Sequence, residues 1–183
     1  MAKITKIQAE MADREAIREC IYRYCRAIDR CDFELLASVY WPDAVEEHDP
    51  FFGSIADFME FTKTILKTMD QTSHLVGNIL IDIKGDTAFV ETYVRAYHRL
   101  SRANGERYDF VTASRYLDVM KRADDEWRIS RRKVSRDWYR EYQDSADWEA
   151  DVFGKPFKPG TRFPDDPSYA LFSRGGGNWP EVM

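Results

Sequence analysis

The sequence lacks the features that mark metal sites, disulfide frameworks and nucleotide cofactors. Its three cysteines are odd in number, lie within twelve residues of one another and form no Cys-X-X-Cys pair. This spacing fits neither a zinc site nor a set of disulfides, and it favours a reducing compartment, the cytoplasm. The sequence contains no phosphate-binding glycine loop, no serine or cysteine nucleophile motif and no dinucleotide fingerprint. We therefore expect neither a metal ion nor an organic cofactor.

Strong positive charge and long apolar runs are absent as well. The formal net charge of −5 over 183 residues argues against a general nucleic-acid binder. No apolar run approaches the length of a membrane span, and the first fifteen residues lack the apolar core of a signal peptide. Aromatic residues make up 14% of the chain. These properties predict an aromatic-rich globular domain and argue against a nucleic acid or a membrane as its partner.

Three stretches in the first seventy residues have the hydrophobic period of helices. The first runs from about residue 13, with Asp13 as its N-cap, to residue 30. A short helix is expected over residues 33–40 and a third over residues 55–69. The hydrophobic period then changes from that of helices to that of strands.

Strands with a period of two follow. Four long ones are expected over about residues 73–84, 87–101, 107–122 and 126–140, after a short one over residues 44–49. Short turns rich in Gly, Asn and Asp separate the long strands, as in antiparallel hairpins. Helices followed by such strands predict an α+β fold, with three N-terminal helices packed on one face of a curved antiparallel sheet.

The composition changes after residue 140. Residues 141–183 hold five of the seven prolines and five of the nine glycines. Disordered tails are poor in aromatics, but this one contains Trp148, Phe153, Phe157, Phe163, Tyr169, Phe172 and Trp179. We therefore divide the chain into a domain over residues 1–140 and an extended C-terminal arm over residues 141–183. We expect the arm to be ordered and to dock on the domain or on a neighbouring subunit.

Two residues stand out as proton-handling candidates. Asp29, at the end of the first helix, lies on the edge of the apolar arc, where the helix dipole and burial would disfavour its charged form. An outward, solvated Asp29 is the alternative. His74 begins the first long strand on the even-numbered face with Asn78, and a neutral imidazole oriented by a carboxylate is the usual general base. The alternative is a histidine that merely bonds a loop. The opposite face should bury an aliphatic layer of Leu75, Ile79, Ile81 and Ile83.

The run WRISRRKVSRDWYR is basic within an acidic protein. It is compatible with a solvated face, with ion pairs between subunits, or with one inward arginine that binds an anionic or phenolic oxygen of a substrate.

Several segments together resemble a known family. They are REAIRECIYRYCRAIDRCDFELLASVYWPDA, GSIADFMEF, TSHLVGNILID and WRISRR, which span about residues 10–140. In this order they resemble the SnoaL-like branch of the nuclear transport factor 2-like superfamily. The resemblance implies a cone-shaped α+β barrel in which three helices close a strongly bent antiparallel sheet around a deep pocket. Within the branch, the motifs are most similar to the Asp–His lyases hexachlorocyclohexane dehydrochlorinase, bile-acid 7α-dehydratase and scytalone dehydratase.

The resemblance also implies roles for individual residues. Asp29 and His74 match the acid–base pair of these lyases, and Tyr24 matches a catalytic tyrosine of the bile-acid enzyme. Tyr24 stands where the dehydrochlorinase has a basic residue, so halide elimination is less expected. Arg132 matches an active-site arginine of the dehydrochlorinase, with Arg136 as the competing candidate. Further candidates for substrate binding are Tyr40, Asn78, Tyr93, Tyr97, Tyr116 and Arg136.

The sequence thus predicts a cofactor-independent lyase acting on a hydrophobic, hydroxylated aromatic or polycyclic molecule. The reaction would be a dehydration or a C–C cleavage such as loss of formaldehyde. An isomerase or cyclase with the same pair of residues is the first alternative, and a non-catalytic ligand-binding or scaffold subunit is the second. The resembling lyases imply a homo-oligomer, with a trimer favoured over a dimer.

Overall fold

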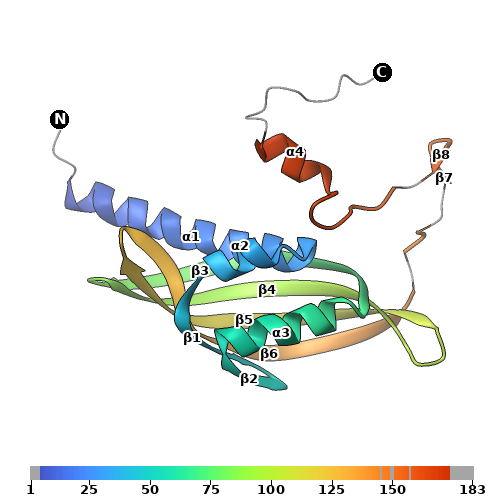
Figure 1. Cartoon of the computed structure of the whole chain (residues 1–183), viewed down its shortest axis with the longest axis horizontal. Helices are drawn as coiled ribbons and strands as arrows, with labels where there is room; N and C mark the ends of the chain where they lie inside the picture. The colour runs from blue at the N-terminus through green and yellow to red at the C-terminus, as the bar shows by residue number, and fades with distance from the viewer. Residues whose placement is uncertain (1–4, 145, 149–150, 157, 174–183) are drawn as a thin grey trace.

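The computed structural model describes residues 5–144, 146–148, 151–156 and 158–173. Three helices lie on one face of a curved, open sheet, and a C-terminal segment extends over the end of the first helix (Figure 1). In chain order the elements are α1 (Lys6–Arg30), α2 (Phe33–Ser38), β1 (Tyr40–His48), β2 (Phe51–Ser54), α3 (Ile55–Leu66), β3 (Met69–Lys84), β4 (Thr87–Ser101), β5 (Arg107–Ala123), β6 (Glu126–Gln143), β7 (Asp151–Val152), β8 (Lys155–Pro156) and α4 (Pro167–Ser173). The expected α+β fold is confirmed.

Helix α1 begins seven residues earlier than the sequence predicts. Its N-cap is Thr5, whose hydroxyl accepts from the N–H of Gln8 while the Gln8 side chain accepts from the Thr5 N–H. Asp13, predicted as the cap, lies inside the helix. Its carboxylate accepts from the Trp127 indole at 2.8 Å and from the Arg122 guanidinium at 2.9 Å, and so ties the helix to the sheet.

The six-stranded sheet has the order β2-β1-β6-β5-β4-β3. Strands β3 to β6 form an antiparallel meander, as predicted, but β1 pairs with β6 in parallel, so the sheet is mixed. The parallel pair arises because α3 and the meander separate β1 from β6 in the chain. Strand β3 is left as a free edge, so half of its backbone N–H groups lack a strand partner.

A bulge in β3 changes which residues face the helices. The register with β4 shifts between Val76 and Ile79. Before the shift the even residue His74 faces inward, and after it the odd residues Ile79, Ile81 and Ile83 do so. The sequence predicts one aliphatic face from Leu75 to Ile83, which is wrong at Leu75, because the extra residue of the bulge reverses the alternation.

The core lies between α1, α2, α3 and the concave face of the sheet. Its fully buried aliphatic members include Ile17, Ile21, Leu36 and Ile129. The termini of α1 lie over different parts of the sheet, because the helix crosses β3 and reaches β6 (Figure 1). The C-terminal end of α1 lies beside β3, where Asp29 contacts Thr72 and His74.

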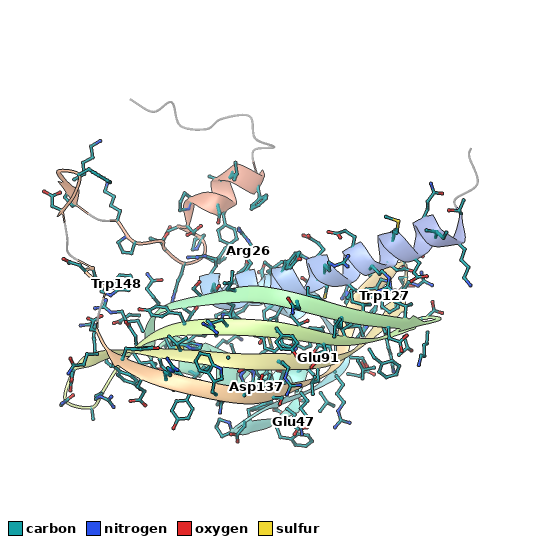
Figure 2. The ribbon with its side chains drawn as sticks, turned by 180° about the vertical axis from the view of Figure 1, so that it is seen from behind. Arg26, Glu47, Glu91, Trp127, Asp137 and Trp148 are labelled. Carbon is teal, nitrogen blue, oxygen red and sulfur yellow. The ribbon has the colours of Figure 1, made fainter. Side chains whose placement is uncertain are left out.

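The C-terminal arm contains short regular elements, namely the hairpin β7–β8 and helix α4, where the sequence predicts none. Residues 160–172 dock on the end of α1. The Phe163 N–H donates to the Arg30 carbonyl at 2.7 Å, and the Arg26 guanidinium lies over the rings of Tyr169 and Phe172 (Figure 2). Phe157 and Trp179 of the predicted aromatic set lie outside the described residues.

Candidate active site

A cavity of about 280 Å³ opens between α1, α3 and the concave face of the sheet. Its lining is mainly apolar, with side chains such as Ile28, Phe58, Phe61 and Leu66. The polar groups among its lining residues include all three histidines of the sequence, His48, His74 and His98, together with Tyr24, Tyr116 and Arg136.

Asp29 and His74 form a hydrogen-bonded pair at one side of this cavity. Asp29 is the penultimate residue of α1, whose C-cap Cys31 adopts the left-handed conformation with φ of 53°. Asp29 Oδ1 lies 2.7 Å from His74 Nδ1 and accepts from the Thr72 hydroxyl at 3.0 Å. Asp29 Oδ2 accepts the His74 backbone N–H at 2.8 Å, one of the donors that the free edge of β3 exposes. The two residues predicted as a pair are thus brought together.

The environment keeps the Asp29 carboxyl group ionised. Burial raises its pKa, but the hydrogen bonds and charge of His74 and the hydroxyl of Thr72 outweigh burial, so the pKa lies below its ordinary value. The sequence predicts a disfavoured charged form, which is wrong because it ignores these three donors. An ionised carboxylate only accepts, so the proton on the His74 ring is on Nδ1 and Nε2 is the basic nitrogen.

His98 lies beside this pair as a neutral ring. Its centroid is 5.6 Å from that of His74, with the rings nearly perpendicular. Burial first, with smaller contributions from the neighbouring His74 and His48, lowers the pKa of His98 to about 4. His98 therefore adds an uncharged, polar imidazole to the cavity wall at neutral pH.

Tyr24 and Tyr116 enclose a buried guanidinium. Arg132 has no exposed surface, and its guanidinium carbon lies 4.1 Å from both ring centroids. Two hydrogen bonds of 2.7 Å join it to the carboxylate of Asp118. Burial also raises the pKa of the Tyr24 hydroxyl, which stays protonated and able to donate.

This arrangement corrects the predicted role of Arg132. The sequence predicts an arginine that contacts the substrate, but Arg132 is not among the described residues that line the cavity. Its ion pair with Asp118 holds it behind the tyrosine rings. Arg136, the competing candidate, lines the cavity, and it contacts Asp49 through the backbone oxygen at 3.3 Å.

Four further candidates lie away from the cavity lining. Tyr93 and Tyr97 are on the outer face of β4, because only the even residues of this strand from Ala88 to His98 point inward. Asn78 is exposed at the bulge of β3. Tyr40 is buried beneath the cavity floor, where its hydroxyl donates to Glu46 at 2.9 Å.

Sequence reasoning missed His48, Glu46 and His98 as members of this site. His98 shares an inward face with Val94 and Ala96, which a period of two indicates. His48 and Glu46 are two residues apart on β1, so they share a face, but the sequence predicts too short a strand there to fix which face is inward.

The arm lines one side of a second, open hollow next to the pair. This hollow is lined by Asp29 and His74 on the domain side and by Asp166, Ser168 and Phe172 on the arm. Arg162 of the arm donates to the carbonyl oxygens of Leu66 and Met69, at 3.0 and 2.6 Å. Leu66 and Met69 both line the main cavity. The arm therefore bonds to the backbone of the cavity wall.

The comparison with known families agrees with this fold and cavity. The SnoaL-like domain matches residues 9–133, which is more than half of the chain. The chain belongs to the SnoaL-like domain family. An uncharacterized protein of Mycobacterium tuberculosis strain H37Rv is 28% identical to the SnoaL-like chain over 127 residues, which are 68% of this chain and 85% of the relative. The arm lies beyond the matched residues.

Two solved structures illustrate the fold of this SnoaL-like protein. A "putative scytalone dehydratase" from Novosphingobium aromaticivorans aligns with a TM-score of 0.66 at 24% identity, over 75% of this chain and 92% of its own. A type 2 hexachlorocyclohexane dehydrochlorinase aligns with a TM-score of 0.66 at 18% identity, over 82% of this chain and 95% of its own. At these identities the likeness shows the fold alone. Among the described residues, no helix is long and apolar enough to cross a membrane.

Proposed function

We propose that this protein is a cofactor-independent lyase that acts on a hydrophobic, hydroxylated aromatic molecule. The observation that carries the proposal is the Asp29–His74 pair at the wall of an apolar cavity. Asp29 fixes the imidazole with Nε2 as its basic nitrogen and stabilises the imidazolium that forms when His74 takes a proton. The solved structures named as a dehydratase and a dehydrochlorinase share the fold on which such a pair would act.

The buried tyrosine cluster supplies the second half of the chemistry. Tyr24 stays protonated and lines the cavity, so its hydroxyl can donate to an oxygen that gains negative charge. Arg132 stacks behind Tyr24 and favours that charge through the ring without touching the substrate. In this role Arg132 is a positioning residue, and Arg136 is the arginine placed to meet the substrate itself.

The volume of the cavity limits the substrate. Ligand pockets for drug-sized molecules span roughly 300–1,000 Å³, and this cavity, at about 280 Å³, lies at the lower end. A molecule with one or two rings fits better than a polycyclic one. Apolar walls and a few polar groups suit a phenol or hydroxymethyl arene. The bond broken would be C–O, as in dehydration, or C–C, as in loss of formaldehyde.

The same pair would also serve an isomerase or a cyclase, because both begin with proton abstraction. A non-catalytic binding or scaffold subunit remains the alternative of another class. The burial of an ionised Asp29 beside His74 favours an enzyme, because a scaffold gains little from a basic nitrogen at the cavity wall.

Site variants test the proposal. We expect His74→Ala and Asp29→Asn to fold and each to lose at least about 10²-fold in turnover, because acid–base groups contribute on that scale. The double variant should be hardly worse than either single one, since the two act as a unit. The assay uses one- and two-ring hydroxylated aromatics, read by mass spectrometry as loss of water or loss of formaldehyde.

Asp82→Asn is the matched control, because Asp82 lies exposed on the same strand as His74. It should retain wild-type turnover. Wild-type turnover in His74→Ala would refute the proposed mechanism, and no conversion of any tested compound by the wild type would favour a binding subunit.

A further inference from the structure

Strand β1 carries a second imidazole–carboxylate pair, in which His48 lines the cavity and Glu46 is fully buried. His48 Nδ1 lies 3.4 Å from Glu46 Oε1, and neither atom has a hydrogen-bond partner among the described residues. The Glu46 side chain is fully buried, and its other oxygen accepts from the Tyr40 hydroxyl at 2.9 Å. The His48 side chain is 31% exposed, lines the cavity and stacks on Phe58.

Buried charges next to Glu46 bear on the protonation of His48. Asp118 and Arg132 form a buried ion pair, and Glu46 lies next to Arg132 across the β1–β6 ladder. If both carboxyl groups are ionised, this buried cluster holds two negative charges and one positive charge. Burying an unbalanced charge is costly. His48 Nδ1 is 3.4 Å from Glu46 Oε1, so a proton on His48 would balance this charge.

The two pairs face the cavity from different ends of the sheet. His74 comes from β3, the edge strand, whereas His48 comes from β1, and β6, β5 and β4 lie between these strands. His98 of β4 lines the cavity between them, with its ring centroid 5.6 Å from that of His74. Asp29 fixes His74 with a free basic nitrogen, and the Glu46 carboxyl group lies 3.4 Å from the Nδ1 atom of His48.

We propose that His48, held by Glu46, is the general acid that protonates the leaving hydroxyl group of the substrate. This step rests on the proposed lyase function. In a dehydration, His74 Nε2 takes a proton from carbon, the C–H electrons form the C=C bond, and the C–O bond breaks. The proton on His48 Nε2 goes to the leaving oxygen, which departs as water. His74 ends as imidazolium and His48 as neutral imidazole, and each then exchanges a proton with solvent, without oxidation or reduction.

The same acid serves the C–C cleavage. There His74 takes the proton of a hydroxymethyl O–H, the C–C bond breaks to release formaldehyde, and its electrons form the C=C bond as a neighbouring hydroxyl leaves. His48 again protonates that hydroxyl. The proposed reaction classes therefore share one requirement, a hydroxyl leaving group within reach of His48.

The protonation of His48 can be measured without any substrate. The probe is the proton itself. Its binding is measured by nuclear magnetic resonance of the full chain with labelled histidine. The three ring signals are assigned with the variants His48→Gln, His74→Gln and His98→Gln. Replacing Glu46 by Gln should shift the titration of His48 by at least about one pH unit to lower pH, a tenfold loss in proton affinity. Besides Glu46, the charged or titratable groups near His48 in the cavity are Arg136 of β6, His98 of β4 and Asp49.

Glu47→Gln is the matched control for this measurement. Glu47 is the next residue on β1, and its carboxylate pairs with Lys133, away from the cavity. This variant should leave the His48 titration unchanged. If Glu46→Gln leaves it unchanged as well, Glu46 does not hold the proton on His48 and the proposal is overturned.

The catalytic role is tested with a substrate from the aromatic panel and its analogue with chlorine in place of the leaving hydroxyl. Chloride leaves without a proton, so we expect His48→Gln to lose at least about 10²-fold on the hydroxyl compound and to keep most of its turnover of the chloride. Equal losses on both compounds, or none on either, would overturn the proposal. His74→Ala should lose turnover on both, so its failure to do so would count against the lyase function and not against His48.

Discussion

A single side chain, His98, connects the cavity to the acid sensitivity of the whole protein. Its pKa of about 4 in the folded chain compares with 6.5 for an ordinary histidine. Between these two values the unfolded chain binds a proton that the folded chain does not. Protonation therefore favours unfolding, and the stability that depends on neutral His98 is lost as the pH falls through this window.

The pH dependence of stability should accordingly change in His98→Gln. We expect the free energy of unfolding of the wild type to fall by up to about 3 kcal/mol more than that of the variant between pH 6.5 and pH 4. Urea unfolding at several pH values measures it. The Asp29 pKa lies below its ordinary 3.8, so the stability that this group contributes is lost only at lower pH and does not interfere. A constant difference between the two proteins across the window would contradict the prediction.

At the scale of residues, the sequence predicts what depends on local spacing and fails where a distant partner decides. Spacing made Asp29 and His74 separate candidates, and only the resemblance paired them. The place of Arg132 could not be derived, since it depends on Asp118, fourteen residues earlier on the neighbouring strand. The sign of the Asp29 pKa shift likewise depends on the hydrogen bonds from His74 and then Thr72, which arise only in the folded chain.

At the scale of elements, Arg162 links the arm to the end of α3 and to the start of β3. Leu66 is the last residue of α3, and its carbonyl oxygen is among those that a helix end leaves without a partner. The Arg162 guanidinium satisfies it and also bonds the first residue of β3, Met69. Arg30 fixes the neighbouring part of the arm by donating to the Thr161 carbonyl at 2.8 Å.

Removing this attachment should loosen the cavity wall. We expect Arg162→Ala to destabilise the protein by roughly 1–3 kcal/mol, the usual cost of losing hydrogen bonds from a charged donor. Truncation before Trp148 should destabilise it further and weaken substrate binding. Thermal unfolding and substrate titration measure the two effects, with Lys158→Gln, an exposed change in the arm, as the control. A truncated protein with unchanged melting temperature and kinetics would show that the arm is dispensable.

The types of the elements were predictable because each periodic segment is long. The ends of the elements, and which face of a strand points inward, were not. Strand β4 has the predicted bounds, since a turn containing Gly85 precedes it and one containing Gly105 follows it. The start of α1 was misplaced, because Thr5 with Gln8 caps better than Asp13. The β3 bulge carries no sequence signal stronger than Gly77, so strict alternation assigned Leu75 to the wrong face.

At the scale of the whole molecule, the outer face of the sheet carries exposed apolar side chains. Figure 2 shows this face, where Glu91 and Asp137 lie on neighbouring parts of the sheet and both bond Arg115. Large exposed apolar side chains on the outer face belong to Leu75, Leu80, Phe89, Tyr93 and Leu117. An apolar surface of this kind is typical of a protein contact site.

We predict that this face contacts a second copy of the chain and that the protein is a homo-oligomer, with a trimer favoured over a dimer. Light scattering after size exclusion should then give a multiple of 21.5 kDa, and Phe89→Glu should lower the mass to that of the monomer. Phe52→Glu, an exposed change on β2, is the control. A monomeric wild type, or one found only with a larger subunit, would contradict the prediction, and the latter would favour the scaffold alternative.

The bulge in β3 also bears on how this protein can be changed by evolution or in the laboratory. On one side of it lie His74 and the cavity, and on the other lie Ile79 to Ile83, which belong to the core. Mutations that alter substrate choice and mutations that restore lost stability therefore fall on different halves of one strand. A library of variants confined to the cavity half leaves the core half unchanged. Variants with new substrate choice then keep the stability that the core half contributes.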